Sequence, residues 1–159
     1  MNEEKSLVLS ETLVNDLIPN TSLSQESLAK ICNRLPELHR AKTAVGRKNS
    51  QTTATLMTMT MLADSPYRQM KQCLSQIDNK RNALIEAHFN TQKSKVKIKK
   101  WEKSGTEMDL VKAQEAKVGI EQMRTSAENA MKEIGMYQDI YDEIRTTHGI
   151  PVGCRTGGC

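Results

Sequence analysis

Histidine and cysteine side chains are the residues of this 159-residue chain that could do metal or covalent chemistry. His148, Cys154 and Cys159 form a short series near the C-terminus, but no fourth ligand stands at the spacing that zinc sites use. His39 and His88 have no adjacent serine, cysteine or carboxylate that would complete a nucleophile and base. We therefore expect no metal site, no cofactor and no catalytic site, and we interpret the chain as a protein that is not an enzyme.

A basic run, KSKVKIKKWEKSG, extends from Lys93 to Gly105 and holds the one tryptophan of the chain. In one interpretation its lysines flank a helical seam and pair with acids of the following stretch, Glu107, Asp109 and Glu115. In the alternative, the lysines contact nucleic-acid phosphates while the tryptophan stacks on a base. The residues of this alternative site are Lys93, Lys95, Lys97, Lys99, Lys100, Trp101 and Lys103.

The composition favours helices that pack on helices. Aromatic residues make up 3% of the chain, so a core must be built from aliphatic residues, methionine and alanine. The charges are divided unevenly: residues 67–104 carry ten lysines and arginines against three acids, whereas residues 105–146 carry five against nine. This division says more about possible partners than the total charge of +4 does.

Two long stretches between residues 65 and 147 predict an antiparallel helical hairpin. Residues 67–104 contain no glycine or proline; they follow Ser65-Pro66, a cap and a favoured first helical residue, and they end at Ser104-Gly105. The second stretch is closed by Gly149-Ile150-Pro151. We expect an all-α fold in which a long coiled-coil hairpin turns at residues 104–105, with arms about 55–60 Å long.

A seam of residues spaced three and four apart runs along both arms. When the arms are folded back at Gly105, positions whose numbers sum to 210 or 211 face each other, and large residues oppose small ones at most layers. Lys80, opposite Ala130, is the exception, and we expect its ammonium to reach the edge of the seam. The predicted seam includes Ile77, Leu84, Ile98, Ile120, Met123, Ile134, Tyr137 and Tyr141.

Residues 1–64 predict a small helical head with short helices, one of which ends before Pro36, and a loop at residues 46–50. The run at residues 52–64 alternates threonine with methionine and fits either a strand or a helix. We interpret this run as a helix, because no partner strand is evident. Residues 148–159 are expected to form a flexible C-terminal tail.

The stretches LADSPYRQMKQCLSQIDNKRNALIEAHF (residues 62–89) and KEIGMYQDIYDEIRTTHGIP (residues 132–151) resemble uncharacterised helical proteins of tailed bacteriophages. The likeness covers the hairpin arms and includes no chemically specific motif. It implies a viral context and, in such proteins, an acidic segment and more helix after the Ile-Pro. This sequence instead ends at Cys159, so its C-terminus is either native or truncated. The resemblance implies no activity.

These features predict a non-enzymatic structural or protein-interaction protein that binds a protein partner, or a second copy of itself, through the coiled coil. We expect the outward face of the seam, with Tyr137 and Tyr141, to extend into a bundle. Nucleic-acid binding at the lysine run is the alternative. No segment has the length and apolar character of a secretory signal or a membrane span. We therefore expect a cytoplasmic protein, in the host cytoplasm or the virion if it is phage-encoded.

Overall fold

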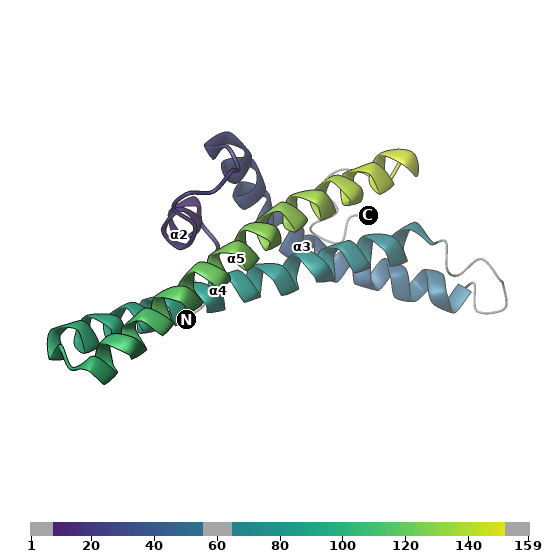
Figure 1. Ribbon diagram of the computed structural model, residues 1–159. Coiled ribbons are helices and arrows are strands. Elements are labelled where there is room, and N and C mark those ends of the chain that lie inside the picture. The colour runs from purple at the N-terminus through teal and green to yellow at the C-terminus, as the bar shows by residue number, and fades with distance from the viewer. Residues whose placement is uncertain (1–7, 56–64, 152–159) are drawn as a thin grey trace.

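The computed structural model describes residues 8–55 and 65–151, and every regular element within them is an α-helix (Figure 1). The helices are α2 (Glu11–Leu17), α3 (Gln25–Thr55), α4 (Pro66–Ser104) and α5 (Glu107–Thr147). The predicted all-α fold is thus confirmed. In the ambiguous run at residues 52–64, residues 52–55 are helical. The rest of that run and residues 152–159 of the predicted tail lie outside the described residues. Of the described part of the tail, Ile150 is buried in the core, so the prediction of a flexible tail that begins at residue 148 is wrong for this residue.

α4 and α5 form the predicted antiparallel hairpin, and local chemistry fixes its turn. Gly105 follows the last residue of α4 with a φ of 71°, a left-handed conformation that suits glycine, and its N–H donates to the Trp101 carbonyl at 3.1 Å. α5 begins at once, because the Thr106 hydroxyl accepts a hydrogen bond from the Asp109 N–H at 3.2 Å. The turn therefore lies at the glycine that predicts it.

The open ends of the hairpin also follow the prediction. α4 begins at Pro66, and the Ser65 hydroxyl makes no hydrogen bond within the described residues, so the proline rather than the serine side chain favours this start. α5 ends after Thr147, where Gly149 has a φ of 61°. The Ile150 N–H donates back to the Arg145 carbonyl at 2.9 Å, the bond expected of a helix closed by a left-handed glycine.

In both arms, a set of buried residues recurs at every seventh position along the predicted seam. These buried residues are Met70, Ile77, Leu84, Thr91 and Ile98 in α4, and Ala113, Ile120, Ala127, Ile134 and Tyr141 in α5. Met123 and Tyr137 are partly buried between them. Lys80 places its ammonium 3.0 Å from the Glu133 carboxylate, so its charge is paired as it leaves the seam. The hairpin is confirmed, whereas supercoiling stays a prediction of the heptad spacing.

The region before the hairpin differs from its prediction, because α3 runs through Pro36 without ending. Proline lacks the N–H that would donate to the carbonyl four residues earlier, here that of Cys32. The apolar residues on either side of it, Leu35 and Leu38, are 4% and 2% exposed and belong to one core. Their burial outweighs the lost hydrogen bond, so the predicted helix end before Pro36 is wrong.

The predicted loop at residues 46–50 is also wrong, since α3 continues as a helix to Thr55. The positive φ values within the described chain belong to Gly105 and Gly149, so Gly46 keeps a helical backbone. Val45 is completely buried and anchors this part of α3. The polar composition resembled that of a loop, but a helix needs only one buried stripe to pack against its neighbour, here α4.

α2 and α3 pack on the hairpin, and buried residues of all four helices share one apolar core that includes residues from Leu9 to Ile150. Where α3 meets α5, Gly135 allows a close approach: a Cβ added there would lie 3.1 Å from Ile31 Cδ1. Gln138 of α5 donates a buried hydrogen bond to the Ile31 carbonyl at 3.0 Å. We call the part of the hairpin that α2 and α3 cover the proximal part.

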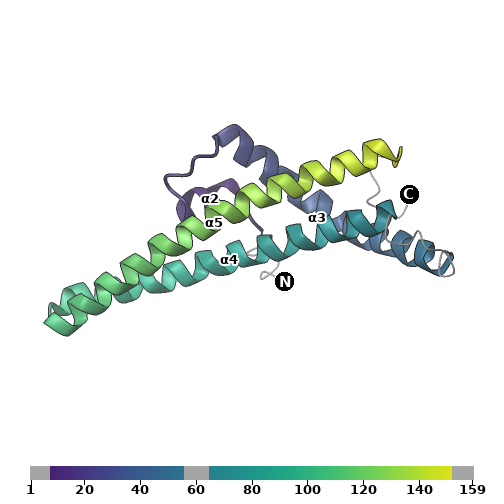
Figure 2. The same ribbon diagram turned by 45° about the vertical axis from the view of Figure 1, so that its right-hand side comes forward.

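The hairpin extends well beyond α2 and α3 as an arm of two helices (Figures 1 and 2). We call residues 93–123 the distal arm. Its buried apolar cluster is separate from the main core and consists of Ile98, Ala113 and Ile120, with Trp101 and Ala116 partly buried beside it. Among the residues that the structure describes, α4 and α5 are the helices that build this cluster.

Candidate binding groove on the distal arm

The end of α2 marks the beginning of the distal arm. The Asp16 carboxylate accepts a hydrogen bond from the Gln92 side chain at 2.8 Å, and the Leu17 carbonyl accepts one from Arg124 Nε at 3.3 Å. Glu128 of α5 accepts hydrogen bonds from the loop that follows α2. Gln92 and Arg124 therefore form a boundary. On one side of it α2 covers the hairpin, and on the other side no described residue does.

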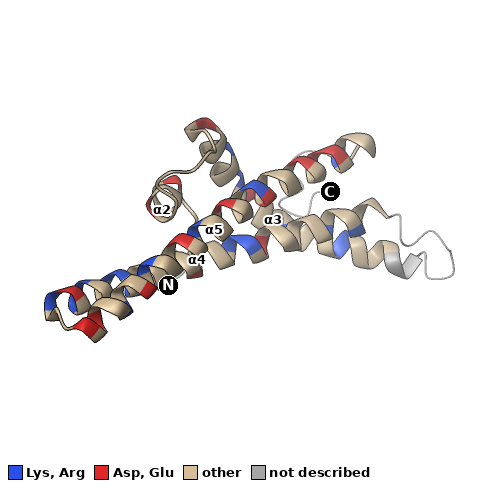
Figure 3. Ribbon diagram, in the orientation of Figure 1, with Lys and Arg blue, Asp and Glu red and all other residues tan. Residues whose placement is uncertain are grey.

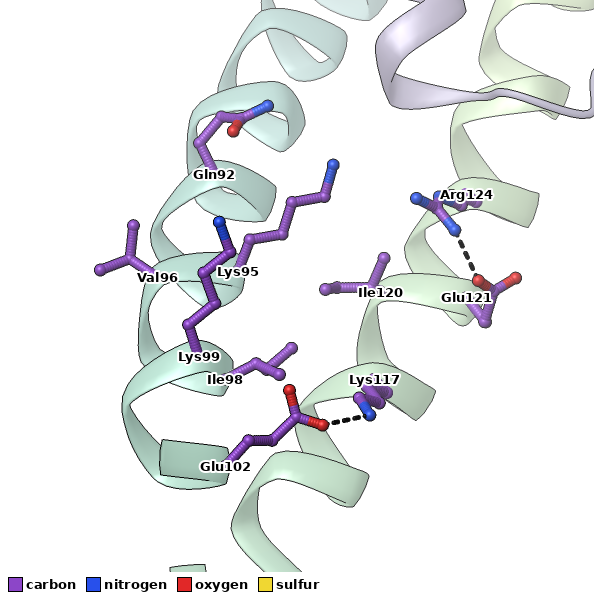
Figure 4. Close-up of a pocket in the computed structure, with 10 residues that line it drawn as sticks. All are labelled: Gln92, Lys95, Val96, Ile98, Lys99, Glu102, Lys117, Ile120, Glu121 and Arg124. Carbon is purple, nitrogen blue, oxygen red and sulfur yellow. Dashed lines mark hydrogen bonds and ion pairs between the residues drawn. The ribbon is translucent and has the colours of Figure 1, made fainter. Parts of the chain in front are cut away.

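A groove between α4 and α5 opens directly beyond this boundary (Figure 4). The groove has a volume of about 510 Å³. Its lining residues are Gln92, Lys95, Val96, Ile98, Lys99 and Glu102 of α4, and Lys117, Ile120, Glu121 and Arg124 of α5. Ile98 and Ile120 point toward each other between the helices, and Lys95 extends across the opening. The groove thus has an apolar base and a charged rim.

The charges of the groove do not cancel. Glu102 of α4 pairs with Lys117 of α5 at 2.7 Å, and Glu121 pairs with the arginine one turn further along α5 at 2.6 Å. Lys95 and Lys99 make no ion pair with any described residue. The groove therefore carries two uncompensated positive charges above its apolar base. We call it the basic groove.

The predicted pairing of the lysine run with the returning arm does not form within the described residues. In the ion pair that joins the two arms near the turn, the acidic partner, Glu102, lies on α4 and the basic partner, Lys117, lies on α5. The expected acids face elsewhere. Glu107 and Asp109 lie in the first turn of α5, where a negative charge stabilises the helix N-terminus. Glu115 lies on the exposed outer side of α5.

Figure 3 shows basic residues along the distal end of α4 and acidic residues near the turn. All lysines of the run except Lys95 are exposed, and Lys95 and Lys99 lie on the side of α4 that forms the groove. Trp101 is partly buried against the distal cluster of apolar residues. Its ring packs within the hairpin, which argues against the base-stacking role that the alternative interpretation gives it.

A second feature of the distal arm lies on the outer side of α5. Val111 and Val118 are 53% and 48% exposed, and they line a shallow depression of about 330 Å³ together with Gln114 and Glu115. Glu107 lies one helical turn before Val111, and Glu115 lies one turn after it. We call these five residues the outer patch, which is apolar at its centre and acidic at its edges.

The tyrosines expected to extend the seam outward are turned toward the core. Tyr141 is 2% exposed, and Arg145 lies over its ring at 5.3 Å. Burial raises the pKa of the Tyr141 hydroxyl above its usual range. Tyr137 is partly buried against the same core. The expectation that these two side chains extend into a larger bundle is therefore wrong for Tyr141, which has almost no surface to offer.

A charged cluster with a buried carboxylate lies in the proximal part. Asp78 is 7% exposed; it accepts a hydrogen bond from Lys42 at 3.0 Å and lies 3.2 Å from His39 Nδ1. Burial opposes the charged form of this carboxyl group, but the hydrogen bonds from Lys42 and His39 outweigh it and hold the pKa of Asp78 below its usual range. This cluster ties α3 to α4.

The two described cysteines, Cys32 and Cys73, are free thiols that lie buried in the core. Burial, with a smaller contribution from Glu11, raises the pKa of the Cys32 thiol to about 11. Burial also raises the pKa of Cys73. A thiol that stays protonated and buried is a poor nucleophile. Both residues therefore act as small apolar side chains in the core.

Within the described residues, no three histidine, cysteine, aspartate or glutamate side chains are grouped so that they could hold a metal ion. None of the described helices is both long and apolar enough to cross a bilayer. Comparisons of the chain with protein-family models, curated proteins and solved structures found no match. The phage resemblance, the absence of catalysis and the nature of the partner therefore stay predictions.

Sequence reasoning identified the lysine run but missed the groove beside it. It placed Ile98 and Ile120 in the seam, and the structure confirms that both are buried. Lys95, Lys99 and Glu102 line the groove beside that seam, and the spacing of the seam gives no signal for them. The boundary with α2 had no local signal either, because Asp16 and Gln92 are 76 positions apart.

Proposed function

We propose that this chain is a non-enzymatic structural or interaction protein, and that the distal arm of its coiled-coil hairpin binds another protein chain. One observation carries the proposal. Nine large apolar side chains stand exposed in the described chain, and five of them belong to the distal arm. They are Val96, Met108, Leu110, Val111 and Val118. Exposed apolar side chains that gather on one element are typical of an interaction surface.

The energetics of the arm support the same proposal. Ordering two helices costs conformational entropy at every residue, and buried apolar surface normally offsets that cost. The distal arm buries only a small cluster around Ile98 and Ile120, whereas the proximal part shares a core with α2 and α3. Because the distal arm adds little to the core, we infer that its role is to bind a partner rather than to stabilise the fold.

Site-specific photocrosslinking tests the proposal. A photoreactive phenylalanine analogue at Val96 or Val118 of the full chain should crosslink to a protein in the cell that makes it, because both positions are exposed on the arm. The same analogue at Thr146, an exposed position near the end of α5, is the matched control. The proposal fails if the two distal positions give no more crosslinked protein than Thr146 does.

Nucleic-acid binding is the second candidate, and the unpaired lysines are the observation that favours it. Fluorescence anisotropy with labelled duplex DNA, single-stranded DNA and RNA, measured over a salt series, tests it. Phosphate contacts predict a steep dependence of affinity on salt. This dependence should become shallower when the six lysines of the run are replaced by alanine: Lys93, Lys95, Lys97, Lys99, Lys100 and Lys103. Affinity that is unchanged in this variant would remove the candidate.

The proposed biological context is viral, with the chain in the host cytoplasm or the virion. The support for it is the resemblance of residues 62–89 and 132–151 to helical proteins of tailed bacteriophages. Protein mass spectrometry of purified virions and of infected-cell extracts tests this context. Detection of the chain in neither preparation would contradict it.

A further inference from the structure

We propose that the basic groove of one copy of this chain binds the outer patch of a second copy. The inference rests on the proposed function and names the partner of the distal arm. Both surfaces lie on the distal arm, one between α4 and α5 and the other on the far side of α5. The molecule thus presents a groove with unpaired lysines and, on the other side of α5, an apolar patch with acidic edges.

The groove is suited to a helix that is apolar at its centre and acidic at its edges. Ile98 and Ile120 form its base, whereas the exposed side chain of Val96 points to the outer side of α4, away from the opening (Figure 4). Lys95 and Lys99 stand above this base without ion-pair partners among the described residues. A helix bound there would bury its apolar residues on the base and place carboxylates beside the two lysines.

The outer patch has the chemistry that this groove requires. Val111 and Val118 are spaced seven residues apart and form an apolar stripe along α5. Glu107 and Glu115 place carboxylates one turn on either side of Val111. The described chain gives Glu115 no ion pair, so its charge is available to a partner. When the patch occupies the groove, its valines contact the apolar base of the groove and its glutamates lie beside the two lysines.

The chain already shows how a helix docks on this side of the hairpin. α2 carries acidic Glu11 and Asp16 and buries Val14 and Leu17. It ends at the boundary of the groove, where Asp16 accepts the hydrogen bond from Gln92. An acidic, apolar helix therefore occupies the space directly before the groove, and the outer patch of a second copy would continue that arrangement toward the tip.

The contact is heterologous, because the groove and the patch are different surfaces of one chain. Each copy that uses its groove keeps its patch free for the next copy. The contact therefore builds either a ring or an extended chain of molecules, and assembly should grow with protein concentration. Such growth suits the structural role in the proposed function.

Sedimentation velocity of the full chain over a wide concentration range tests the inference. The wild type should rise above its monomer mass of 17.9 kDa as concentration increases. A groove variant, Lys95→Glu with Lys99→Glu, should raise the dissociation constant at least about tenfold, because the new glutamates of the groove would repel the glutamates of the outer patch. A patch variant, Gln114→Lys with Glu115→Lys, should weaken assembly to a similar extent, because the new lysines of the patch would repel the lysines of the basic groove.

A mixture of the two variants should assemble again. The acidic patch of the groove variant then meets the basic groove of the patch variant, and the reversed pair is complementary as well. Such a rescue requires that both variants are folded. A charge-matched control, Lys93→Glu with Lys97→Glu, alters lysines that do not line the groove and should assemble within about twofold of the wild type.

Three results would overturn the inference: a wild type that stays monomeric at every concentration, a mixture that stays monomeric, or a control that loses assembly as strongly as the groove variant. The photocrosslinking experiment separates this failure from that of the proposed function. A monomeric chain that crosslinks to a different protein through Val118 would end the self-association inference and leave the proposed function standing. If neither self-association nor a crosslink appears, both fail.

Discussion

The proximal and distal parts of the hairpin follow the same seven-residue spacing but differ in what surrounds them. In the proximal part, Ile134 is completely buried in a core to which α2 and α3 contribute. In the distal arm, Ile120 is 9% exposed and belongs to a small cluster between two helices. The proximal part exposes Phe89, Met136 and Ile140 around a large shared core, whereas the shorter distal arm exposes five large apolar side chains around a small cluster.

This difference teaches that one sequence pattern supports two tasks. A heptad seam brings two helices together wherever it occurs, but additional helices decide how much of the hairpin becomes core. α2 ends where its Asp16 and Leu17 contact Gln92 and Arg124, and beyond these residues no described helix covers the groove between α4 and α5. We therefore expect stability to be concentrated in the proximal part, and we propose that binding belongs to the distal arm.

Replacing one seam isoleucine by alanine in each part should give the largest difference in lost stability between the two parts. Ile134→Ala should lower the free energy of unfolding by about 4 kcal/mol, because it leaves a cavity in the shared core. Ile120→Ala should lower it by about 2 kcal/mol, because only a small cluster between two helices surrounds this side chain and can relax into the space that it leaves. Urea denaturation followed by circular dichroism measures both losses. Equal losses would contradict the division between the two parts.

The Asp78 cluster should make the proximal part sensitive to acid. The folded-state pKa of Asp78 lies below its unfolded value of about 3.9, so its stabilisation is complete above that pH and is lost as the pH falls through the folded pKa. Asp78→Asn should lower the free energy of unfolding by about 1–2 kcal/mol at neutral pH, because it removes the charge that Lys42 and His39 bind.

The pH dependence supplies the control for this prediction. The difference between wild type and Asp78→Asn should persist from neutral pH down to about pH 5 and should shrink below about pH 4, where the carboxyl group becomes protonated. Denaturation curves at each pH measure it. A difference that stays constant into strong acid would mean that the carboxylate charge of Asp78 does not stabilise the fold.

Two glycines of α5 provide the smallest and most local comparison. Gly119 lies in the distal arm, and a Cβ added there meets no atom within 4 Å, so Gly119→Ala should stabilise the chain by up to about 1 kcal/mol through helix propensity. Gly135→Ala should give little or no gain, because the new Cβ would press on Ile31 Cδ1 at 3.1 Å. Thermal melts compare the two. A larger gain at Gly135 would contradict the close packing of α3 on α5.

Much of the hairpin could be predicted because its signals are local or periodic. Gly105 marks the turn, Pro66 marks the start of α4, and the seven-residue spacing selects the buried residues. The course of α3 could not be predicted in this way. Pro36 is a strong local signal for a helix end, and only the burial of Leu35 and Leu38 against distant helices overrides it.

The candidate site was predicted in part for the same reason. The lysine run is evident in the sequence, but whether its lysines find partners depends on where the acids of α5 face. Glu115 and Lys95 could be assigned to helices, yet their separation onto different surfaces of the arm follows from the way α4 and α5 pack. The groove itself depends on where α2 stops, which no local pattern records.

Hydrogen–deuterium exchange of the wild-type chain at a low and a high protein concentration tests the central claim most directly. At low concentration, amides of residues 93–123 should exchange faster than those of the proximal part, because fewer buried contacts hold the distal arm. At high concentration, protection should increase in the distal arm and stay unchanged in the proximal part. Protection that is uniform along the hairpin and independent of concentration would contradict the division of stability and binding between its two parts.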